Sequence, residues 1–403
     1  MTSPVLFARA RTRAWLAGLA LAIAGCAAPP QATNLSNELP FEEAVAKATD
    51  GLVTQTQTLP AFLAKVESKL NKKGVVLDPM LDSTTGQQTA ATVLLENRVT
   101  ERMSTQYDQF EILPFRAANL SRAQYLLTGT LTRAAADRSK RGLAINLALT
   151  DLKTGTVVAH ASAIARDEGI DSTPLPYYRD SPVLVKDKVI EGYVATSATA
   201  PGSKADGYYM ERIAAATLIN EATDLYNQER YQDALGQYRS ALATPAGEQM
   251  RVLNGIYLSN AKLGRTAEAE QAFGRVVAFG IASNQLGVKF LFNPGSTEFW
   301  SDPKISGPYQ MWLRQIAKEG NAARACMNII GHTSHTGSEQ ANDALSLQRA
   351  NFIRQRLASE SAPLAARAKV TGMGFRENIV GSGTDNAVDA LDRRVEFKIV
   401  PCS

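Results

Sequence analysis

Apolar residues in the first part of the chain alternate between helical spacing and strand-like spacing. The Lys153-Thr154-Gly155 turn separates the last two strand patterns and predicts a hairpin. A helix-strand-helix-strand unit followed by a β-meander predicts an α/β sandwich over residues 41–200. The predicted helices cover 41–53, 59–70 and 89–103, and the predicted strands cover 72–81, 107–115, 123–132, 142–155 and 156–165.

Residues 168–206 mix Pro, Ser, Gly and Ala and show few helical signals. We expect a long exposed connection here, with a domain boundary near Pro201-Gly202.

Residues 207–282 are predicted to be helical and contain an internal repeat. Ala234, Tyr238 and Ala241 recur 35 positions later as Ala269, Phe273 and Val276. The period and the stretch YQDALGQYRSAL resemble a tetratricopeptide repeat. A generic helical hairpin that links two domains is the alternative. Two repeats are fewer than independent stability usually requires, so we expect them to pack on a neighbouring domain.

Residues 286–403 alternate strand and helix in the order β-α-β-α-β-β, which predicts an α+β domain within an α+β multidomain chain. The predicted strands are 288–293, 326–332, 368–374 and 393–400, and the predicted helices are 309–318 and 339–358. The buried side of the longer helix is predicted to carry Ala341, Leu345, Ala350, Ile353 and Leu357.

Residues 1–26 combine Arg9, Arg11 and Arg13 with an apolar stretch that ends at Cys26, which is typical of a secretory signal peptide. The ending Ile-Ala-Gly-Cys resembles a bacterial lipobox, which implies fatty-acid (palmitate-type) lipidation of Cys26. An ordinary signal peptide cut near Ala27 or Ala28 is the alternative. The non-acidic Ala27 after the cysteine implies a lipid anchor on the periplasmic face of the outer membrane, and 27–40 reads as a tether.

Net charge and cysteine content narrow the function classes. A net charge of +4 without a basic face gives nucleic-acid binding no support. No nucleophile-base pair, phosphate loop or cofactor motif predicts an enzyme, and His332 with His335 lacks a third metal ligand nearby. In an oxidising compartment Cys326 and Cys402 predict a disulfide, with two separate buried thiols as the alternative.

The stretch GHTSHTGSEQANDALSLQRANFIRQRL, followed by VTGMGF and DALDRRVEFKIV, resembles the OmpA C-terminal peptidoglycan-associating domain. This resemblance implies non-covalent binding of the diaminopimelate arm of the peptidoglycan stem peptide, which carries carboxylates and an ammonium group. The implied contact residues are Thr333, Ser334, Asn342, Arg349 and Arg393.

Within that resemblance Arg349 takes the ligand carboxylate, helped by the positive end of its helix. Asn342 and Arg393 are implied to line the same pocket. Alternatively, Asn342 only bonds the loop backbone, and Arg393 is an exposed charge at the sheet edge.

The chain departs from the family at Ser334, where the family has an aspartate that pairs with the ligand ammonium. Losing a charge-assisted contact of about 1.5 to 3 kcal/mol weakens binding roughly ten- to a hundredfold. Glu339 or Asp343 can compensate only if the fold aims one of them at the pocket. Asp392 stands where the family usually has asparagine, and this acid can compete with the ligand for Arg393.

Two blocks in the N-terminal domain, VVLDPMLDSTTGQQTAATVLLENRV and YLLTGTLT with INLALTDLKTGTVVAHAS, resemble bacterial envelope lipoproteins of flagellar assembly and curli secretion. This resemblance implies a scaffold module with an unidentified envelope protein as its partner. The sequence therefore predicts an outer-membrane lipoprotein that binds peptidoglycan and scaffolds an envelope assembly. The alternative is an assembly or activator lipoprotein whose OmpA-like domain has lost wall binding and contacts proteins.

Overall fold

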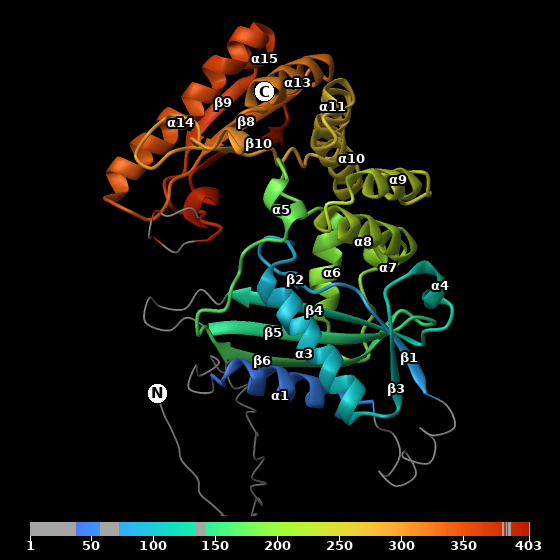
Figure 1. The fold of residues 1–403 in the computed structure, drawn as a ribbon. Coiled ribbons are helices and arrows are strands. Elements are labelled where there is room, and N and C mark those ends of the chain that lie inside the picture. Colours follow the sequence, from blue (N-terminus) through green and yellow to red (C-terminus); the bar gives the residue numbers. More distant parts are fainter. Residues whose placement is uncertain are drawn as a thin grey trace, which may run out of the picture. The chain divides into compact units, whose positions relative to one another are not determined.

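The computed structural model describes residues 38–56, 72–133, 142–380, 383, 385 and 388–402 of the 403-residue chain (Figure 1). The predicted signal peptide with Cys26, most of the tether and the predicted helix 59–70 lie outside these residues. Residues Glu38–Ser403 form one compact unit. No helix in the described part of the chain has the length and apolar character needed to cross a bilayer.

The first sheet has the strand order β3-β1-β4-β5-β6, and β2 pairs with β4. Strand β1 is parallel to β3 and β4, whereas β4, β5 and β6 form the predicted antiparallel meander. Gly155 occupies the predicted hairpin turn with a φ of +64°, a conformation that glycine adopts without a steric penalty. The strands are β1 (Lys73–Leu77), β2 (Leu81–Asp82), β3 (Phe110–Leu113), β4 (Tyr125–Arg133), β5 (Gly142–Asp151) and β6 (Thr156–Arg166).

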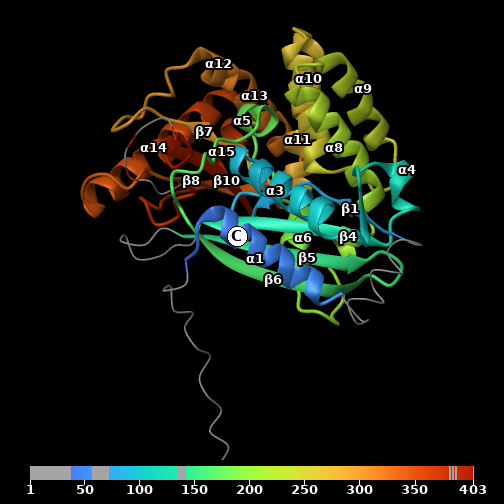
Figure 2. The same ribbon diagram turned by 60° about the horizontal axis from the view of Figure 1, so that its bottom comes forward.

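Alternate residues of this sheet pack into separate cores because successive side chains of a strand point to opposite faces. Val75 and Leu77 of β1 belong to the core beneath helices α1 (Phe41–Thr54) and α3 (Ala90–Gln106). Val76 packs instead with Val189 and Tyr193 of α6 (Lys188–Ser197). Figures 1 and 2 show α1 and α3 together over one face of the sheet. The shorter helix α4 (Ala117–Leu120) follows β3.

The prediction of an exposed connection over residues 168–206 is wrong. This segment contains α5 (Pro176–Asp180) and α6 (Lys188–Ser197) and is followed by α7 (Gly207–Met210). Tyr177 and Tyr193 are buried at 0% and 2% exposure. The Asp187 carboxylate caps α6 by accepting the amides of Val189 and Ile190. The overall Pro, Ser and Gly content obscured this cap and the short apolar stripe behind it.

Four helices follow, and they place the repeated residues in the protein interior. All six residues of the internal repeat are buried, at 5% exposure or less. They share one hydrophobic core with the C-terminal domain, where the Trp312 indole donates a 2.8 Å hydrogen bond to the Tyr257 hydroxyl. The repeats therefore pack on a neighbouring domain as expected, while their relation to tetratricopeptide repeats stays a prediction. The helices are α8 (Ile213–Asn227), α9 (Tyr231–Leu242), α10 (Met250–Lys262) and α11 (Thr266–Ala282).

The second sheet has the order β7-β10-β8-β9. Strand β10 is antiparallel to both β7 and β8, and β8 is parallel to β9, so the α+β prediction is confirmed. Strand β7 is shorter than predicted because Val288 and Phe292 form isolated bridges elsewhere. The elements are β7 (Phe290–Leu291), α12 (Pro303–Ser306), α13 (Tyr309–Ala322), β8 (Cys326–Gly331), α14 (Glu339–Glu360), α15 (Ala362–Ala366), β9 (Ala368–Gly372), a 3-10 helix (Val388–Leu391) and β10 (Arg394–Val400).

The two C-terminal cysteines are joined. Cys326 pairs with Val400 in the β8-β10 ladder, which brings the end of the chain beside the start of β8. Cys326 and Cys402 form a disulfide with their Cα atoms 5.2 Å apart. The predicted disulfide is therefore present.

Candidate ligand-binding site

The buried stripe of α14 is polar in its first half and apolar in its second half. Ala341, which was predicted to be buried, is exposed, and Leu345 is only partly buried. The first half of the stripe faces loops rather than the apolar sheet core, so hydrophobic periodicity does not reveal it. The buried residues are Asn342, Ser346, Arg349, Ala350, Ile353 and Leu357.

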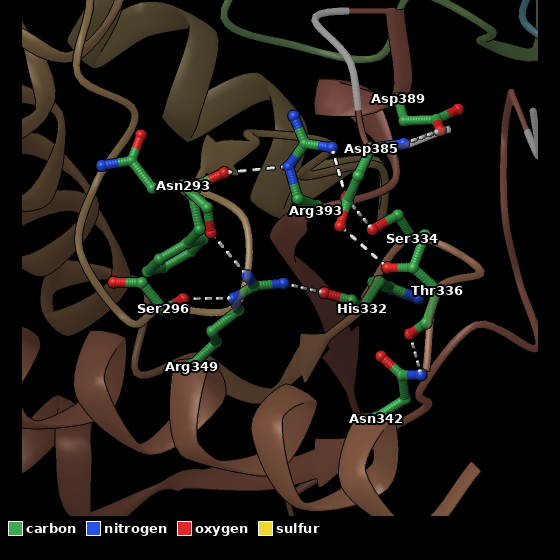
Figure 3. A network of polar contacts seen from close by, with 11 residues as sticks. Asn293, Ser296, His332, Ser334, Thr336, Asn342, Arg349, Asp385, Asp389 and Arg393 are labelled. Carbon is green, nitrogen blue, oxygen red and sulfur yellow. Dashed lines mark hydrogen bonds and ion pairs between the residues drawn. The ribbon is translucent and has the colours of Figure 1, made fainter. Parts of the chain in front are cut away.

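Arg349 ties three backbone carbonyls of two loops to α14 (Figure 3). Its Nε, Nη1 and Nη2 atoms donate 2.9 Å hydrogen bonds to the carbonyls of Ser296, His332 and Asn293 respectively. The side chain is buried, and no carboxylate of the described residues forms an ion pair with it. Burial, together with the nearby charge of Arg393, lowers the pKa of Arg349 to about 10. The guanidinium thus remains cationic at neutral pH while its hydrogen bonds go to neutral carbonyls.

Asp385 brings a carboxylate to the position that the sequence left without one. It accepts hydrogen bonds from the hydroxyls of Ser334 and Thr336, the latter at 2.8 Å (Figure 3). It also forms a 2.9 Å ion pair with Arg393. Its own amide donates to the Asp389 carboxylate at 2.9 Å, which holds Asp385 at a left-handed φ of +57°. Burial alone would raise the pKa of Asp385, but the two hydroxyls and Arg393 lower it, so the carboxylate is ionised.

Three other predicted contact residues line the same pocket and are almost fully buried. Thr333, Ser334 and Asn342 are exposed by 1%, 3% and 5%. The Asn342 amide donates to the carbonyls of Thr336 at 2.7 Å and Ser338 at 3.0 Å, which is the loop-bonding alternative stated above.

Arg393 is an interior residue, so its interpretation as an exposed charge at the sheet edge is wrong. It is 1% exposed, lies 5.2 Å from the centre of the Trp300 ring and donates to the Phe292 carbonyl at 3.3 Å. The preceding Asp392 accepts the amides of Ile379 and Val380 at 2.6 and 2.9 Å. This acid therefore holds the loop before the 3-10 helix.

One pocket of about 400 Å³ lies beside the first turns of α14, and its lining includes Ser334, Asn342, Arg349 and Asp385 but not Arg393, which was expected to line it. Its wall combines the cationic Arg349, the anionic Asp385, hydroxyl groups and small apolar side chains. Such a wall suits a small zwitterion that has an apolar chain between its charges. Neither Glu339 nor Asp343 lines the pocket, and both pair with Arg376 at 3.4 and 2.7 Å. The lining residues are Gly295, Thr333, Ser334, Thr336, Ala341, Asn342, Ala344, Leu345, Gln348, Arg349 and Asp385.

A second polar cluster lies next to the site around the buried His332. Its Nε2 atom is 3.4 Å from Glu396 Oε1, and Arg394 Nε is 2.9 Å from Glu396 Oε2. The carboxylate of Glu377 brings three possible metal-ligand atoms within 4.8 Å of one another. The fold therefore places two carboxylates near His332, and His335 is not part of this group. The sequence did not show it because Glu377 and Glu396 are more than 40 residues away along the chain.

Glu396 makes the stability of this domain dependent on pH. Burial alone would raise the pKa of Glu396, but His332 and Arg394 together lower it from the ordinary 4.5 to about 2. A carboxylate with a lowered folded-state pKa stabilises the fold above pH 4.5, and this contribution is lost as the pH falls toward 2. From the size of the shift, we expect a contribution on the order of 3 kcal/mol at neutral pH.

Glu396→Gln should lower the free energy of unfolding at pH 7 and reduce its dependence on pH between about 2 and 5. Urea unfolding at a series of pH values, followed by tryptophan fluorescence, measures both effects. Glu298→Gln is the control, because Glu298 is an exposed loop residue. Equal acid sensitivity of the Glu396→Gln variant and the parent would contradict the assignment.

Comparison with known proteins agrees with this architecture. Residues 291–390 match the OmpA family, so the chain carries an OmpA family domain at its C-terminus. Among curated proteins none matches this chain.

Three solved structures are similar to parts of the chain. The peptidoglycan-associated lipoprotein from Burkholderia pseudomallei is 23% identical, with 29% of this chain and 94% of that chain covered and a TM-score of 0.25. An outer membrane protein from Borrelia burgdorferi B31 is 24% identical, with coverages of 28% and 85% and a TM-score of 0.21. The periplasmic domain of Helicobacter pylori MotB is 19% identical, with coverages of 28% and 82% and a TM-score of 0.23.

Asp385 was not predicted as a site residue. This residue precedes Arg393 by eight positions in the turn-rich stretch GSGTDNAVDALDRR. An acid in a loop just before the paired arginines could have indicated this site residue, because such a loop must return to the end of the sheet where those arginines lie. Its hydrogen bond with Ser334, 51 residues away, follows only from the fold.

Proposed function

We propose that this protein is an outer-membrane lipoprotein that binds the diaminopimelate arm of peptidoglycan non-covalently through its OmpA family domain. Its lipid anchor at Cys26 would hold it on the periplasmic face of the outer membrane. The N-terminal domain and the helical repeats would then recruit an envelope protein. In this role the protein is a binding scaffold without catalytic activity.

The pocket beside α14 carries this proposal. Arg349 presents a positive charge that no carboxylate of the described residues pairs with directly, and Asp385 presents a negative charge on the same wall. Two opposite unit charges about 4 Å apart attract by roughly 4 kcal/mol at an effective dielectric constant near 20, before desolvation costs. A ligand that carries both a carboxylate and an ammonium group satisfies both charges. The diaminopimelate arm has this chemistry, and one of the similar structures is a peptidoglycan-associated lipoprotein by name.

Ala344→Trp tests the pocket without removing any polar group of the site. Ala344 is exposed on α14 and lines the pocket, so an indole there should obstruct ligand entry. We expect retention of the full-length protein on purified sacculi, in detergent, to fall at least tenfold.

Ala358→Trp is the matched control. Ala358 is also an exposed alanine of α14 but does not line the pocket, so retention should match that of the parent protein. Equal retention of all three proteins would place wall binding elsewhere or show that it is non-specific.

One observation favours the second candidate function, an assembly or activator lipoprotein that has lost wall binding. The five contact residues implied by the family are each exposed by 5% or less, and Arg393 is already paired with Asp385. If the parent protein is not retained on sacculi at all, this second function replaces the first.

A further inference from the structure

We infer that Asp385 supplies the carboxylate that recognises the ligand ammonium, and that Ser334 serves to position it. This inference rests on the proposed function, because it names the residue that selects the zwitterion in the same pocket. It assigns the ammonium contact to a loop residue that lies 51 positions after Ser334.

Asp385 lies next to the position where the family has its aspartate. An aspartate at position 334 would carry its charge on the side chain that lines the pocket after strand β8. Here the Ser334 hydroxyl donates a hydrogen bond to Asp385, which puts a carboxylate one hydrogen bond away from that position. The Thr336 hydroxyl binds the other carboxylate oxygen at 2.8 Å, so two neighbouring loop residues fix its orientation (Figure 3).

Asp385 is more accessible than Ser334. Ser334 is 3% exposed, whereas the Asp385 side chain is 28% exposed and lines the pocket. A carboxylate offers about four acceptor positions, and Ser334, Thr336 and Arg393 use three of them. The remaining capacity suits one N–H donor from a ligand ammonium.

The charges around the pocket favour the same assignment. Arg349 and Arg393 bring two positive charges to the site, and among the described residues Asp385 is the only acid that lines the pocket. Arg393 therefore holds Asp385 ionised and in place, while the buried Arg349 adds a positive charge to the pocket wall that attracts the ligand carboxylate. Without Asp385 the site would be strongly cationic and would repel an ammonium group. The nearby acids Glu339 and Asp343 are paired with Arg376 and lie outside the pocket wall.

The test compares two probes on the full-length protein in detergent. One probe is a diaminopimelate-containing stem peptide with its free amine, and the other is the same peptide with that amine acetylated. Asp385→Asn is expected to weaken binding of the free-amine peptide roughly ten- to a hundredfold, measured by calorimetric titration. Affinity for the acetylated peptide should change by less than about threefold, because that peptide presents no ammonium.

Ser334→Asp combined with Asp385→Asn provides the rescue variant. It moves the carboxylate back onto residue 334, so it should recover most of the affinity for the free-amine peptide. Glu339→Gln, which removes an exposed acid outside the pocket, is the charge control and should bind as the parent does.

The outcomes separate this inference from the proposed function. If the parent protein binds neither peptide, the proposed function and this inference both fail. If the parent binds the free-amine peptide and Asp385→Asn binds it equally well, only the inference is overturned. An equal loss for both peptides, without rescue by the double variant, would show that Asp385 has a purely structural role.

Discussion

Replacing Arg349 with methionine is expected to lower the free energy of unfolding of the C-terminal domain by about 3 kcal/mol or more. The buried guanidinium donates to the carbonyls of Asn293, Ser296 and His332, and methionine leaves all three without this donor. Each buried acceptor left unsatisfied costs roughly 1 to 3 kcal/mol. This loss outweighs the free energy that the variant gains because it no longer buries a cation. The variant should also lose retention on sacculi, because the positive wall of the pocket is gone.

Tryptophan fluorescence during urea unfolding measures the first effect in the full-length protein. Trp300 and Trp312 both lie in the C-terminal domain, and the third tryptophan, Trp15, lies in the predicted signal peptide. Arg349→Lys keeps a charge but lacks the planar fork that reaches three carbonyls, so we expect a smaller loss of stability and reduced retention.

Arg354→Met is the matched control, because Arg354 is an exposed arginine of the same helix. Its unfolding free energy should stay within about 0.5 kcal/mol of the parent value. If the Arg349→Met variant also unfolds at the parent's urea concentration, the three carbonyl contacts do not hold the loops as described.

Replacing both Cys326 and Cys402 with serine should lower the unfolding free energy of the same domain by about 4 kcal/mol. The disulfide joins residues 76 positions apart, and in the chain-entropy model such a loop restricts the unfolded chain by roughly this amount. Both cysteines are replaced because Cys326 is buried at 9% exposure and would remain as a free thiol in a single variant.

Reduction of the parent protein with dithiothreitol provides an independent measurement of the same quantity. It should shift the tryptophan unfolding curve as far as the double substitution does. The double-serine variant should not respond to the reductant. A curve for the variant that matches the oxidised parent would show that the disulfide adds little to the pairing of β8 with β10.

The candidate site was only partly predictable. The residue types around 331–350 and 393–395 identify the OmpA family domain, and the structure gathers Ser334, Asn342 and Arg349 around one pocket. Their burial was not predictable, because the exposed fraction of Arg349 depends on loop 293–296, which folds over it. Asp385 was not predictable as a site residue for the same reason, since no local pattern relates it to Ser334.

From the amino-acid sequence alone we could predict the alternation of helices and strands, the α+β character of the C-terminal domain and the cysteine pair. These features follow from the local spacing of apolar residues and from residue types, which a linear chain displays directly. The three-dimensional fold was needed to show that Tyr177 and Tyr193 are interior, that α14 buries a polar stripe and that a distant loop brings a carboxylate to Ser334. Burial and charge pairing depend on which segments meet in space, and hydrophobic periodicity carries no information about contacts between polar side chains far apart in the chain.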